Sequence, residues 1–226
     1  AMEFPTLVAK VVDLDPVDDP TLCASRVMEE IGADALTTEV GYRGDQRWGV
    51  TLDEIPVPGD SLSDALGRRP VILLTGGAGG IMGDIAERLA SRLAARIVLT
   101  DIIVPEAGEE TESTSRIIDA IERVERAGGT GLYVQADVMD PGSVERAVRA
   151  AVARFGRIDA VLHGAGMEQS RGLAKKDTET FRRIVAIKVA GAGNLAGSVM
   201  THCSPRCFLF FSSVAGRFGN AGQADY

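Results

Sequence analysis

Residues 71–81 have the sequence Val71-Ile72-Leu73-Leu74-Thr75-Gly76-Gly77-Ala78-Gly79-Gly80-Ile81. The apolar run predicts a buried strand, and the glycines after it predict a tight turn into a helix. Backbone N–H groups at a helix N-terminus attract anions, and glycines let a phosphate approach the backbone closely. The turn therefore predicts a nucleotide-binding site, with a turn that binds nothing as the alternative. Its candidate residues are Thr75, Gly76, Gly77, Gly79, Gly80 and Ile81.

From Arg69 onward the chain alternates apolar runs with helical patterns. We predict strands at residues 71–75, 96–101, 131–136, 160–163 and 207–212, separated by helices over 81–95, 114–127, 143–155 and 178–200. This alternation is typical of an α/β fold built on a doubly wound parallel sheet. A long acidic loop, residues 105–112, follows the second of these strands.

The first part of the chain has a different pattern. We predict a strand over residues 7–13, a helix capped by Asp19, and two short strands at 38–42 and 48–52. The helical spacing predicts one buried stripe, made of Ala24, Val27, Met28 and Ile31. Residues 56–69 are rich in Pro, Gly, Ser and Asp, which is typical of a linker. The chain therefore divides into residues 1–68 and 69–226.

Composition excludes several classes of function. A net charge of −8 and a pI near 4.9 argue against binding to nucleic acid or to an anionic membrane. Three cysteines without a C-x-x-C pair indicate a reducing compartment, so we expect a cytoplasmic protein. We expect no metal site, because His202, Cys203 and Cys207 lack a fourth ligand. We expect no membrane span, because no apolar run approaches the roughly 20 residues that cross a bilayer.

A second motif stands near the C-terminus, where Ser213 precedes Tyr226 by thirteen residues. Residues 211–216 have the sequence Phe-Ser-Ser-Val-Ala-Gly, and residues 222–226 have the sequence Gly-Gln-Ala-Asp-Tyr. With the glycine-rich turn, these segments resemble the short-chain dehydrogenase/reductases. Within that family, the sequences of these two segments are similar to those of the ketoreductase domains of polyketide or polyunsaturated fatty-acid synthases.

The resemblance implies a Rossmann-like fold of the short-chain reductase type. Residues 39–47, Glu-Val-Gly-Tyr-Arg-Gly-Asp-Gln-Arg, look like the end of the structural subdomain that precedes a synthase ketoreductase. Residues 1–68 would then be the end of this small non-catalytic α/β segment plus a linker. Residues 69–226 would be the catalytic subdomain, C-terminally incomplete after its active-site tyrosine, because complete members continue with another helix and two strands.

The resemblance also implies a catalytic set of Lys188, Ser213 and Tyr226. Ketone reduction needs hydride on carbon and a proton on the developing alkoxide. Tyrosine has a pKa near 10 and is a poor acid at pH 7 unless a cation lies near it. Tyr226 would be the acid, Ser213 would hold the carbonyl oxygen, and Lys188 would supply the cation from residues 186–195, which match the lysine-bearing helix of synthase ketoreductases.

Further cofactor residues follow from the resemblance. Ala136, Asp137 and Val138 match the element that contacts the adenine, while His163, Gly164, Ala165 and Gly166 match the turn beneath the nicotinamide. Met82 stands where many members have a glycine, which predicts a shifted helix contact. The family favours NADPH, but Asp101 at the end of the second strand is a residue that bonds an unphosphorylated ribose. We predict NADPH, with NADH as the alternative.

The predicted function is reduction of a 3-oxoacyl thioester on an acyl carrier protein, within a multi-domain synthase. A non-catalytic ketoreductase-like scaffold and a stand-alone short-chain alcohol dehydrogenase are the alternatives. Arg171, Lys175 and Lys176 form a basic cluster on an acidic chain. We consider two roles for the cluster: a docking site for the acidic carrier or its phosphopantetheine phosphate, and a solvated helix start.

Overall fold

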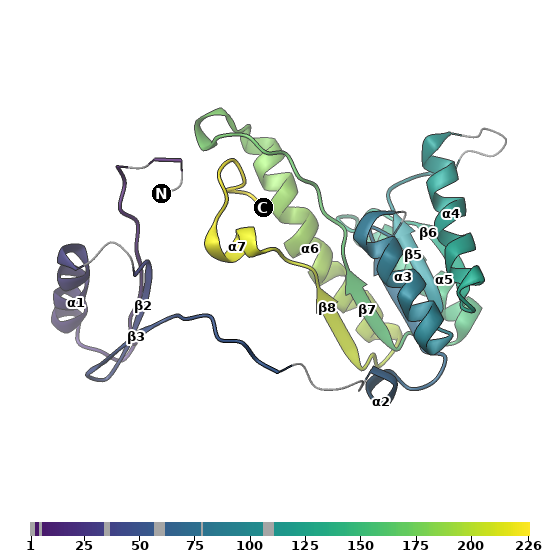
Figure 1. Cartoon of the computed structure of the whole chain (residues 1–226), viewed down its shortest axis with the longest axis horizontal. Helices are drawn as coiled ribbons and strands as arrows, with labels where there is room; N and C mark the ends of the chain where they lie inside the picture. The colour runs from purple at the N-terminus through teal and green to yellow at the C-terminus, as the bar shows by residue number, and fades with distance from the viewer. Residues whose placement is uncertain (1–2, 5, 34–36, 57–61, 78, 106–110) are drawn as a thin grey trace. The chain divides into compact units, whose positions relative to one another are not determined.

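A computed structural model describes residues 3–4, 6–33, 37–56, 62–77, 79–105 and 111–226. The chain forms two compact units, residues 1–58 and 59–226 (Figure 1). Of the predicted linker, residues 57–61 lie outside the described residues, as do Ala78 of the glycine-rich turn and residues 106–110 of the acidic loop. The remainder of the linker contains a short helix, α2 (Leu62–Leu66), which buries Leu66 in the core of the second unit.

The second unit is built on a five-stranded parallel sheet, which confirms the predicted fold class. Its strands are β4 (Val71–Thr75), β5 (Arg96–Asp101), β6 (Thr130–Gln135), β7 (Ala160–His163) and β8 (Cys207–Phe210), in the spatial order β6-β5-β4-β7-β8. Every neighbouring pair is parallel. Crossover helices connect them: α3 (Gly80–Leu93), α4 (Glu112–Arg126), α5 (Pro141–Phe155) and α6 (Thr178–His202), with a 3-10 turn η1 (Leu173–Lys175) and a short α7 (Val214–Phe218).

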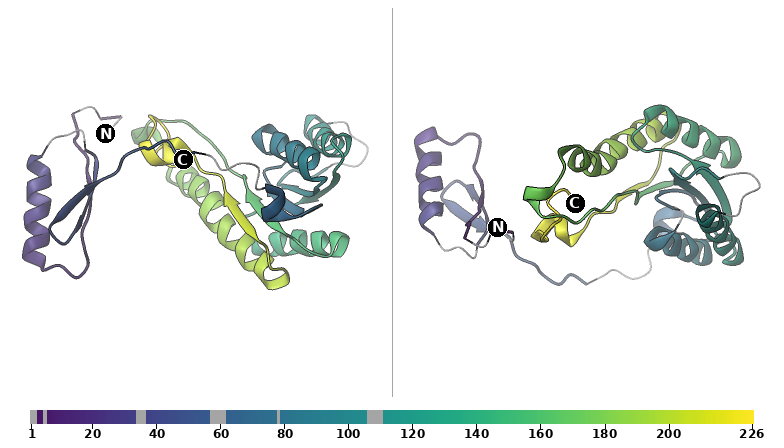
Figure 2. Two further views of the ribbon diagram at one scale, coloured as in Figure 1. Left: turned by 60° about the horizontal axis from the view of Figure 1, so that its bottom comes forward. Right: turned by 90° about the horizontal axis from the view of Figure 1, so that it is seen from above.

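Helices cover both faces of this sheet, so alternate residues of the central strands enter two separate cores (Figure 2). Ile72 and Leu74 of β4 pack with α3 and α4, whereas Val71 and Leu73 pack with α5 and α6. All four side chains are at most 1% exposed. Burial on both faces explains why β4 is a continuous apolar run rather than an alternating one.

Helix α6 corrects one expectation. It is the helix, among the described residues, whose length and mean hydropathy would suit a membrane span. In the structure it packs beside α5 and contributes Leu195 and Val199 to a core cluster. About 22% of this apolar stretch is buried inside the described structure, and a single helix of this length and composition is weak evidence for a membrane span.

The first unit contains a three-stranded sheet and one helix. The strands are β1 (Val11–Asp13), β2 (Glu39–Arg43) and β3 (Gln46–Gly49); β1 and β2 are parallel, and β2 and β3 are antiparallel. Helix α1 (Pro20–Gly32) begins at the predicted cap, where the Asp19 carboxylate accepts a hydrogen bond from Thr21 N at 2.8 Å. The hairpin turns at Gly44, which has φ of +55° and so adopts the left-handed conformation that glycine favours.

The predicted buried stripe of α1 is wrong. Met28 and Ile31 are 67% and 72% exposed, whereas Arg26 and Glu30 are buried. Arg26 pairs with Asp18, bonds the carbonyl of Gly44 and lies over the Tyr42 ring. Helical spacing alone could not show this, because the face that turns toward the sheet is selected by its polar partners.

Glu30 is the centre of this polar core. Its carboxylate accepts hydrogen bonds from Arg47 Nε at 2.5 Å, Tyr42 Oη at 2.7 Å and Lys10 Nζ at 3.2 Å. The Arg47 guanidinium above all, then Tyr42 and Lys10, lower the pKa of Glu30 to about 2. Tyr42, Gly44 and Arg47 all belong to the motif at residues 39–47, so this motif supplies bonds between the hairpin and α1.

Replacing Glu30 with alanine should loosen the first unit, because Arg47 and Lys10 would lose a shared anion. We expect amide hydrogens of β2 to exchange at least about tenfold faster, corresponding to about 1.4 kcal/mol of local stability. Hydrogen–deuterium exchange with mass spectrometry measures this. Glu29→Ala removes an exposed carboxylate of the same helix and should leave the rate unchanged; equal rates in both variants would contradict the prediction.

Candidate active site

The order of the strands reverses between β4 and β7, and the candidate site lies there. In open α/β sheets, ligands bind outside the carboxyl ends of the strands at this point. Thr75 and His163, the last residues of the two strands, are register partners. The glycine-rich turn follows Thr75 and the turn at residues 164–166 follows His163, so the structure brings two predicted cofactor turns together.

The glycines of the first turn serve two different purposes. Gly76 has φ of +71°, and a Cβ on it would lie 2.9 Å from the backbone of Ala165. A Cβ on Gly77 would lie 2.8 Å from Leu99 Cδ2. Around Gly79 and Gly80 a Cβ would meet no described atom within 4 Å. Gly76 and Gly77 are therefore needed for packing, while Gly79 and Gly80 leave space above the turn.

That space lies at the N-terminus of α3, where no described side chain makes a capping hydrogen bond. The first N–H groups of a helix lack intrahelical partners and carry partial positive charge. Ile81 is 73% exposed, so it does not cover them. The arrangement fits the pyrophosphate of a dinucleotide, which would accept hydrogen bonds from these groups.

Met82 explains the departure from the family pattern. Its side chain is only 5% exposed. A Cβ on Gly164 would lie 2.3 Å from the Met82 sulfur, so the thioether packs directly against that glycine. Helix α3 and the second turn are therefore in close contact, which Met82 makes against a residue without a side chain.

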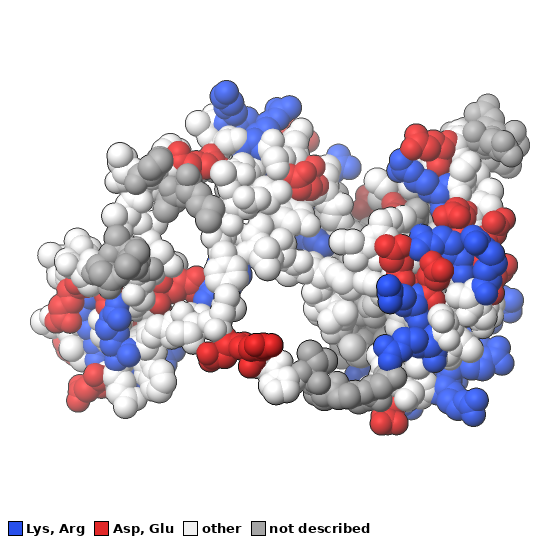
Figure 3. Space-filling view, in the orientation of Figure 1, with Lys and Arg blue, Asp and Glu red and all other residues white. Residues whose placement is uncertain are grey.

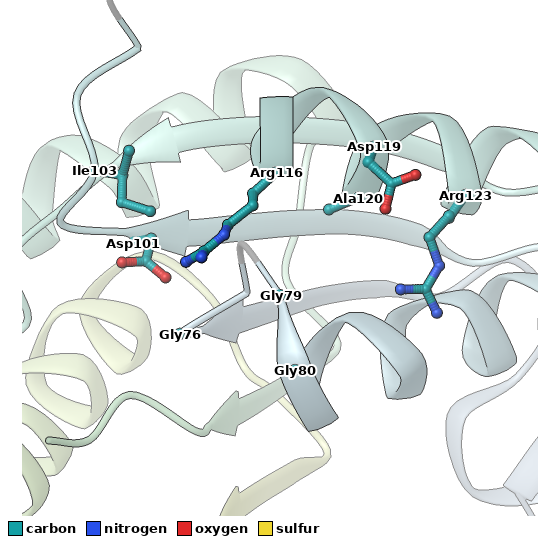
Figure 4. Close-up of a pocket in the computed structure, with 9 residues that line it drawn as sticks. All are labelled: Gly76, Gly79, Gly80, Asp101, Ile103, Arg116, Asp119, Ala120 and Arg123. Atoms are coloured by element: carbon teal, nitrogen blue, oxygen red, sulfur yellow. The ribbon is translucent and has the colours of Figure 1, made fainter. Parts of the chain in front are cut away.

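Two cavities adjoin the turns. One of about 600 Å³ lies between α3 and α4 and is lined by Gly76, Gly79, Gly80, Asp101, Ile103, Arg116, Asp119, Ala120 and Arg123 (Figure 4). The other, of about 360 Å³, is lined by residues of the β6–α5 loop and of the turn after β7. Gly76 and Asp101 line both cavities. An extended ligand could therefore lie across the carboxyl ends of β5, β4 and β7.

Asp101 faces a cation that sequence reasoning missed. Its carboxylate accepts a hydrogen bond from Ile102 N at 2.8 Å. Arg116 of α4 lines the same cavity, and Figure 4 shows its guanidinium extending toward Asp101. Arg116 also pairs with Glu112, one turn earlier. The residues directly after β5 that the structure describes, Ile102 to Pro105, supply no cation, whereas the crossover helix α4 brings one back from its second turn.

The predicted adenine element, residues 136–138, lines the smaller cavity. Asp137 Oδ1 accepts a hydrogen bond from Met139 N at 2.9 Å, which fixes the turn. The N-cap of α5 is Asp140, three residues further on. Asn194 of α6 donates from Nδ2 to the carbonyl of Val138 at 2.9 Å, which ties the loop to the lysine-bearing helix.

His163 is buried and bonded on both sides of its ring. Its Nε2 lies 3.1 Å from the carbonyl oxygen of Ile187, which can only accept, so this nitrogen carries the proton. Nδ1 then accepts from the Thr75 hydroxyl at 2.7 Å. Thr75 Oγ1 in turn accepts from Ala165 N at 3.1 Å. The imidazole therefore joins the glycine-rich strand, the second turn and the residue before Lys188.

Lys188 is held by two backbone carbonyls. Its Nζ donates to Phe211 O at 2.9 Å and to Gly164 O at 3.4 Å. A Cβ on Gly166 would lie 3.0 Å from Lys188 Cε, so the second turn leaves room for this side chain. Burial lowers the pKa of Lys188. The ammonium is therefore placed at the cofactor turn and at the end of β8, instead of in bulk solvent.

Ser213 and Tyr226 stand at the two ends of the last segment. Ser213 is the N-cap of α7, where its Oγ accepts from Ala215 N at 3.1 Å and keeps its own proton to donate. Tyr226 is 41% exposed. Among the described residues, no hydrogen bond joins the Tyr226 hydroxyl to Ser213 or Lys188. The structure thus brings Lys188 to the carbonyl of Phe211, two residues before Ser213. Tyr226 is joined to the preceding segment by the bond from its backbone N–H to Gln223 O.

The basic cluster at residues 171–176 is only partly a surface patch. Arg171 and Lys175 are exposed, and basic side chains gather at the η1 end of α6, toward the top of Figure 3. Lys176 is different, because its side chain is 5% exposed and pairs with Asp225. Lys176 cannot contact a carrier, so the hypothesis for this residue is wrong.

Comparisons with known proteins show which family and fold this chain is similar to. A family model described as KR domain matches residues 70–226. Polyketide synthase PksM of Bacillus subtilis (strain 168) is 32% identical over 154 residues, covering 68% of this chain and 3% of the synthase. A ketoreductase domain from the bacillaene assembly line superposes with a TM-score of 0.77 at 27% identity, covering 100% of this chain and 51% of that one.

A third similarity concerns the fold alone. Carveol dehydrogenase from Mycobacterium avium, solved in complex with NAD, has a TM-score of 0.62 and 22% identity and covers 71% of this chain and 60% of that one. This similarity shows that the two chains share the fold. The chain spans a few per cent of the curated synthase and about half of the bacillaene chain.

Stability should depend on pH through His163. Burial, and then the charge of Lys188, lower its pKa below the ordinary value of about 6.5. The unfolded chain therefore binds a proton that the folded protein excludes, and the free energy of unfolding should fall as pH drops from 7.5 to 5.5. Urea denaturation across this range measures it, at pH values above the carboxylate titrations.

His163→Asn should lower stability at pH 7.5 and remove most of this slope. His202→Gln replaces the other histidine of the chain and should keep the slope. A slope that persists in His163→Asn would show that other groups cause it.

Proposed function

Because the chain belongs to the KR domain family and has the short-chain reductase fold, it is an oxidoreductase, and we propose that it reduces 3-oxoacyl thioesters to 3-hydroxyacyl thioesters. One observation carries the proposal: the Lys188 ammonium lies between the cofactor turn and the end of β8, bonded to Gly164 O and Phe211 O. A lysine needed only for solubility would not be half-buried at the point where both predicted sites meet.

The residues of this chain would divide the chemistry as follows. The nicotinamide cofactor supplies hydride when bound, and the chain has to stabilise the alkoxide that forms. Ser213 donates its free hydroxyl proton to the carbonyl oxygen, a bond that strengthens as charge develops. Tyr226 transfers its phenolic proton to that oxygen. The Lys188 ammonium stabilises the phenolate that remains, because opposite charges attract strongly in a partly buried site.

We propose NADPH as the cofactor. Arg116 supports this choice, since its guanidinium enters the cavity that Gly79 and Asp101 line, where a 2′-phosphate would be recognised (Figure 4). Arg123 is less available, because Asp84 and Glu87 already pair with it. Asp101 supports the opposite choice, because a carboxylate accepts from a free ribose hydroxyl. We therefore expect Arg116 and Asp101 together to set the preference for NADPH over NADH.

We propose that the substrate is carried by an acyl carrier protein within a larger synthase. The matched relatives are multi-domain polyketide synthases, and this chain corresponds to a small part of each. Arg171 and Lys175 are exposed cations that lie just before the start of α6. Carrier proteins of this class are acidic, so these two side chains would steer association in a salt-dependent way.

Replacing Tyr226 with phenylalanine tests the function directly. The variant loses only the phenolic hydroxyl, so turnover of a soluble 3-oxoacyl thioester should fall at least about a hundredfold, the usual size of a general-acid effect. The Kd for NADPH should stay within about twofold. Turnover of the full-length protein is followed by cofactor absorbance.

Two results would contradict this assignment. A phenylalanine variant with wild-type turnover would remove Tyr226 from the reaction. A wild-type protein that binds cofactor but reduces no thioester would instead be the non-catalytic scaffold.

Arg116→Ala tests the choice of cofactor. Loss of the guanidinium should weaken NADPH binding at least about tenfold and leave NADH binding unchanged, because only NADPH carries the 2′-phosphate. Asp101→Ala should weaken NADH selectively. Fluorescence titration with each cofactor gives the Kd values of the wild type and of each variant. Arg126→Ala, which removes an arginine of α4 outside the cavity, is the control; equal losses for both cofactors in Arg116→Ala would rule out phosphate recognition.

A further inference from the structure

A buried ion pair lies beside the proposed acid and has no part in the chemistry described above. Lys176 Nζ donates to both carboxylate oxygens of Asp225, at 2.7 and 2.8 Å. The two side chains are 5% and 2% exposed. The third proton of the ammonium goes to the carbonyl of Gln169 at 3.0 Å. All three donors of Lys176 are therefore used, which fixes the geometry of the pair.

The pair joins two segments that matter to the site. Lys176 directly precedes Asp177, the N-cap of α6, and α6 carries Lys188. Asp225 directly precedes Tyr226 in the chain. The pair therefore connects the start of the lysine-bearing helix to the residue before the tyrosine.

Weaker contacts align the same two segments. Arg171 N donates to Gly222 O at 2.9 Å, and Gln223 Nε2 donates to Glu168 Oε1 at 3.0 Å. Gly222 has φ of +80°, and a Cβ there would lie 3.3 Å from Arg171 N. These contacts are neutral or exposed, whereas the ion pair is buried and specific in its geometry, because a misplaced partner would leave an unpaired charge away from water.

Tyr226 is tied to the preceding segment through its backbone. Its N–H donates to Gln223 O at 3.0 Å, and the residue is 41% exposed. The direction of its ring depends on the backbone at residue 225, which the ion pair immobilises.

We propose that the Lys176–Asp225 pair is a positioning clamp that holds Tyr226 at a set place relative to Lys188. The clamp rests on the proposed role of Tyr226 as the acid. Its members are positioning residues: neither contacts substrate, and both act through the tyrosine. A proton donor displaced by about 1 Å can lose on the order of a hundredfold in rate, so a clamp of this kind has a measurable effect.

The test is a double-mutant cycle in the full-length protein with a soluble 3-oxoacyl thioester. Lys176→Met should lower kcat at least about tenfold. In a Tyr226→Phe background the same change should have no further effect, because the group it positions is already gone. The Kd for NADPH should stay within about twofold in each variant. Arg182→Met removes an exposed cation from the same helix start and is the matched control.

The outcomes separate the clamp from its alternatives. If Lys176→Met lowers kcat by the same factor in both backgrounds, or weakens NADPH binding in parallel, the pair supports the fold in general and the proposal fails. Unchanged kcat would also overturn it. Failure of the proposed function is distinguishable, because Tyr226→Phe alone would then retain turnover. Should Lys176→Met not fold, Asp225→Asn keeps the shape, removes the negative charge, and should show the same dependence on Tyr226 with a smaller loss.

Discussion

The arrangement of the candidate site depends on the hydrogen bonds of His163, which connect the glycine-rich turn to helix α6. Its ring accepts from Thr75 at the glycine-rich turn and donates to the carbonyl of Ile187, next to Lys188. The bond to Thr75 is buried and the bond to Ile187 is partly buried, and together they need the neutral ring with its proton on Nε2. The cofactor turn and the lysine-bearing helix are therefore joined through one side chain with one tautomer, located where the strand order reverses.

Both units use buried charges where apolar packing could have been expected. In the first unit the Glu30 carboxylate accepts hydrogen bonds from Lys10, Tyr42 and Arg47. In the second unit the Lys176 ammonium donates to Asp225. A buried pair has a large desolvation cost, so its net contribution to stability is small. Its geometry is nevertheless specific, because a misplaced partner leaves an unpaired charge in a low-dielectric environment. These pairs thus define where segments meet more than they add stability.

Sequence patterns predicted the second unit well and the first unit poorly. Strands β4, β5 and β7 have the predicted bounds, since long apolar runs bordered by glycine or charge leave few alternatives. In the first unit β3 begins at Gln46, two residues before the predicted strand, and α1 turns its apolar residues outward. A three-stranded sheet offers little apolar area for a helix to cover. The face of α1 that packs on it is therefore set by polar partners and not by the spacing of the apolar residues.

The sequence by itself determined the kind of site: a strand, a glycine-rich turn and a helix N-terminus, followed by Lys188, Ser213 and Tyr226 at recognisable spacings. These features depend on residues close together in the chain. Only the tertiary structure decided which charges enter the site. Arg116 reaches the cavity because α4 crosses back over β5. Lys175 and Lys176 are identical neighbours, yet one is exposed and the other is buried against Asp225, 49 residues away. No local rule separates them, because desolvation depends on the partner that folding supplies.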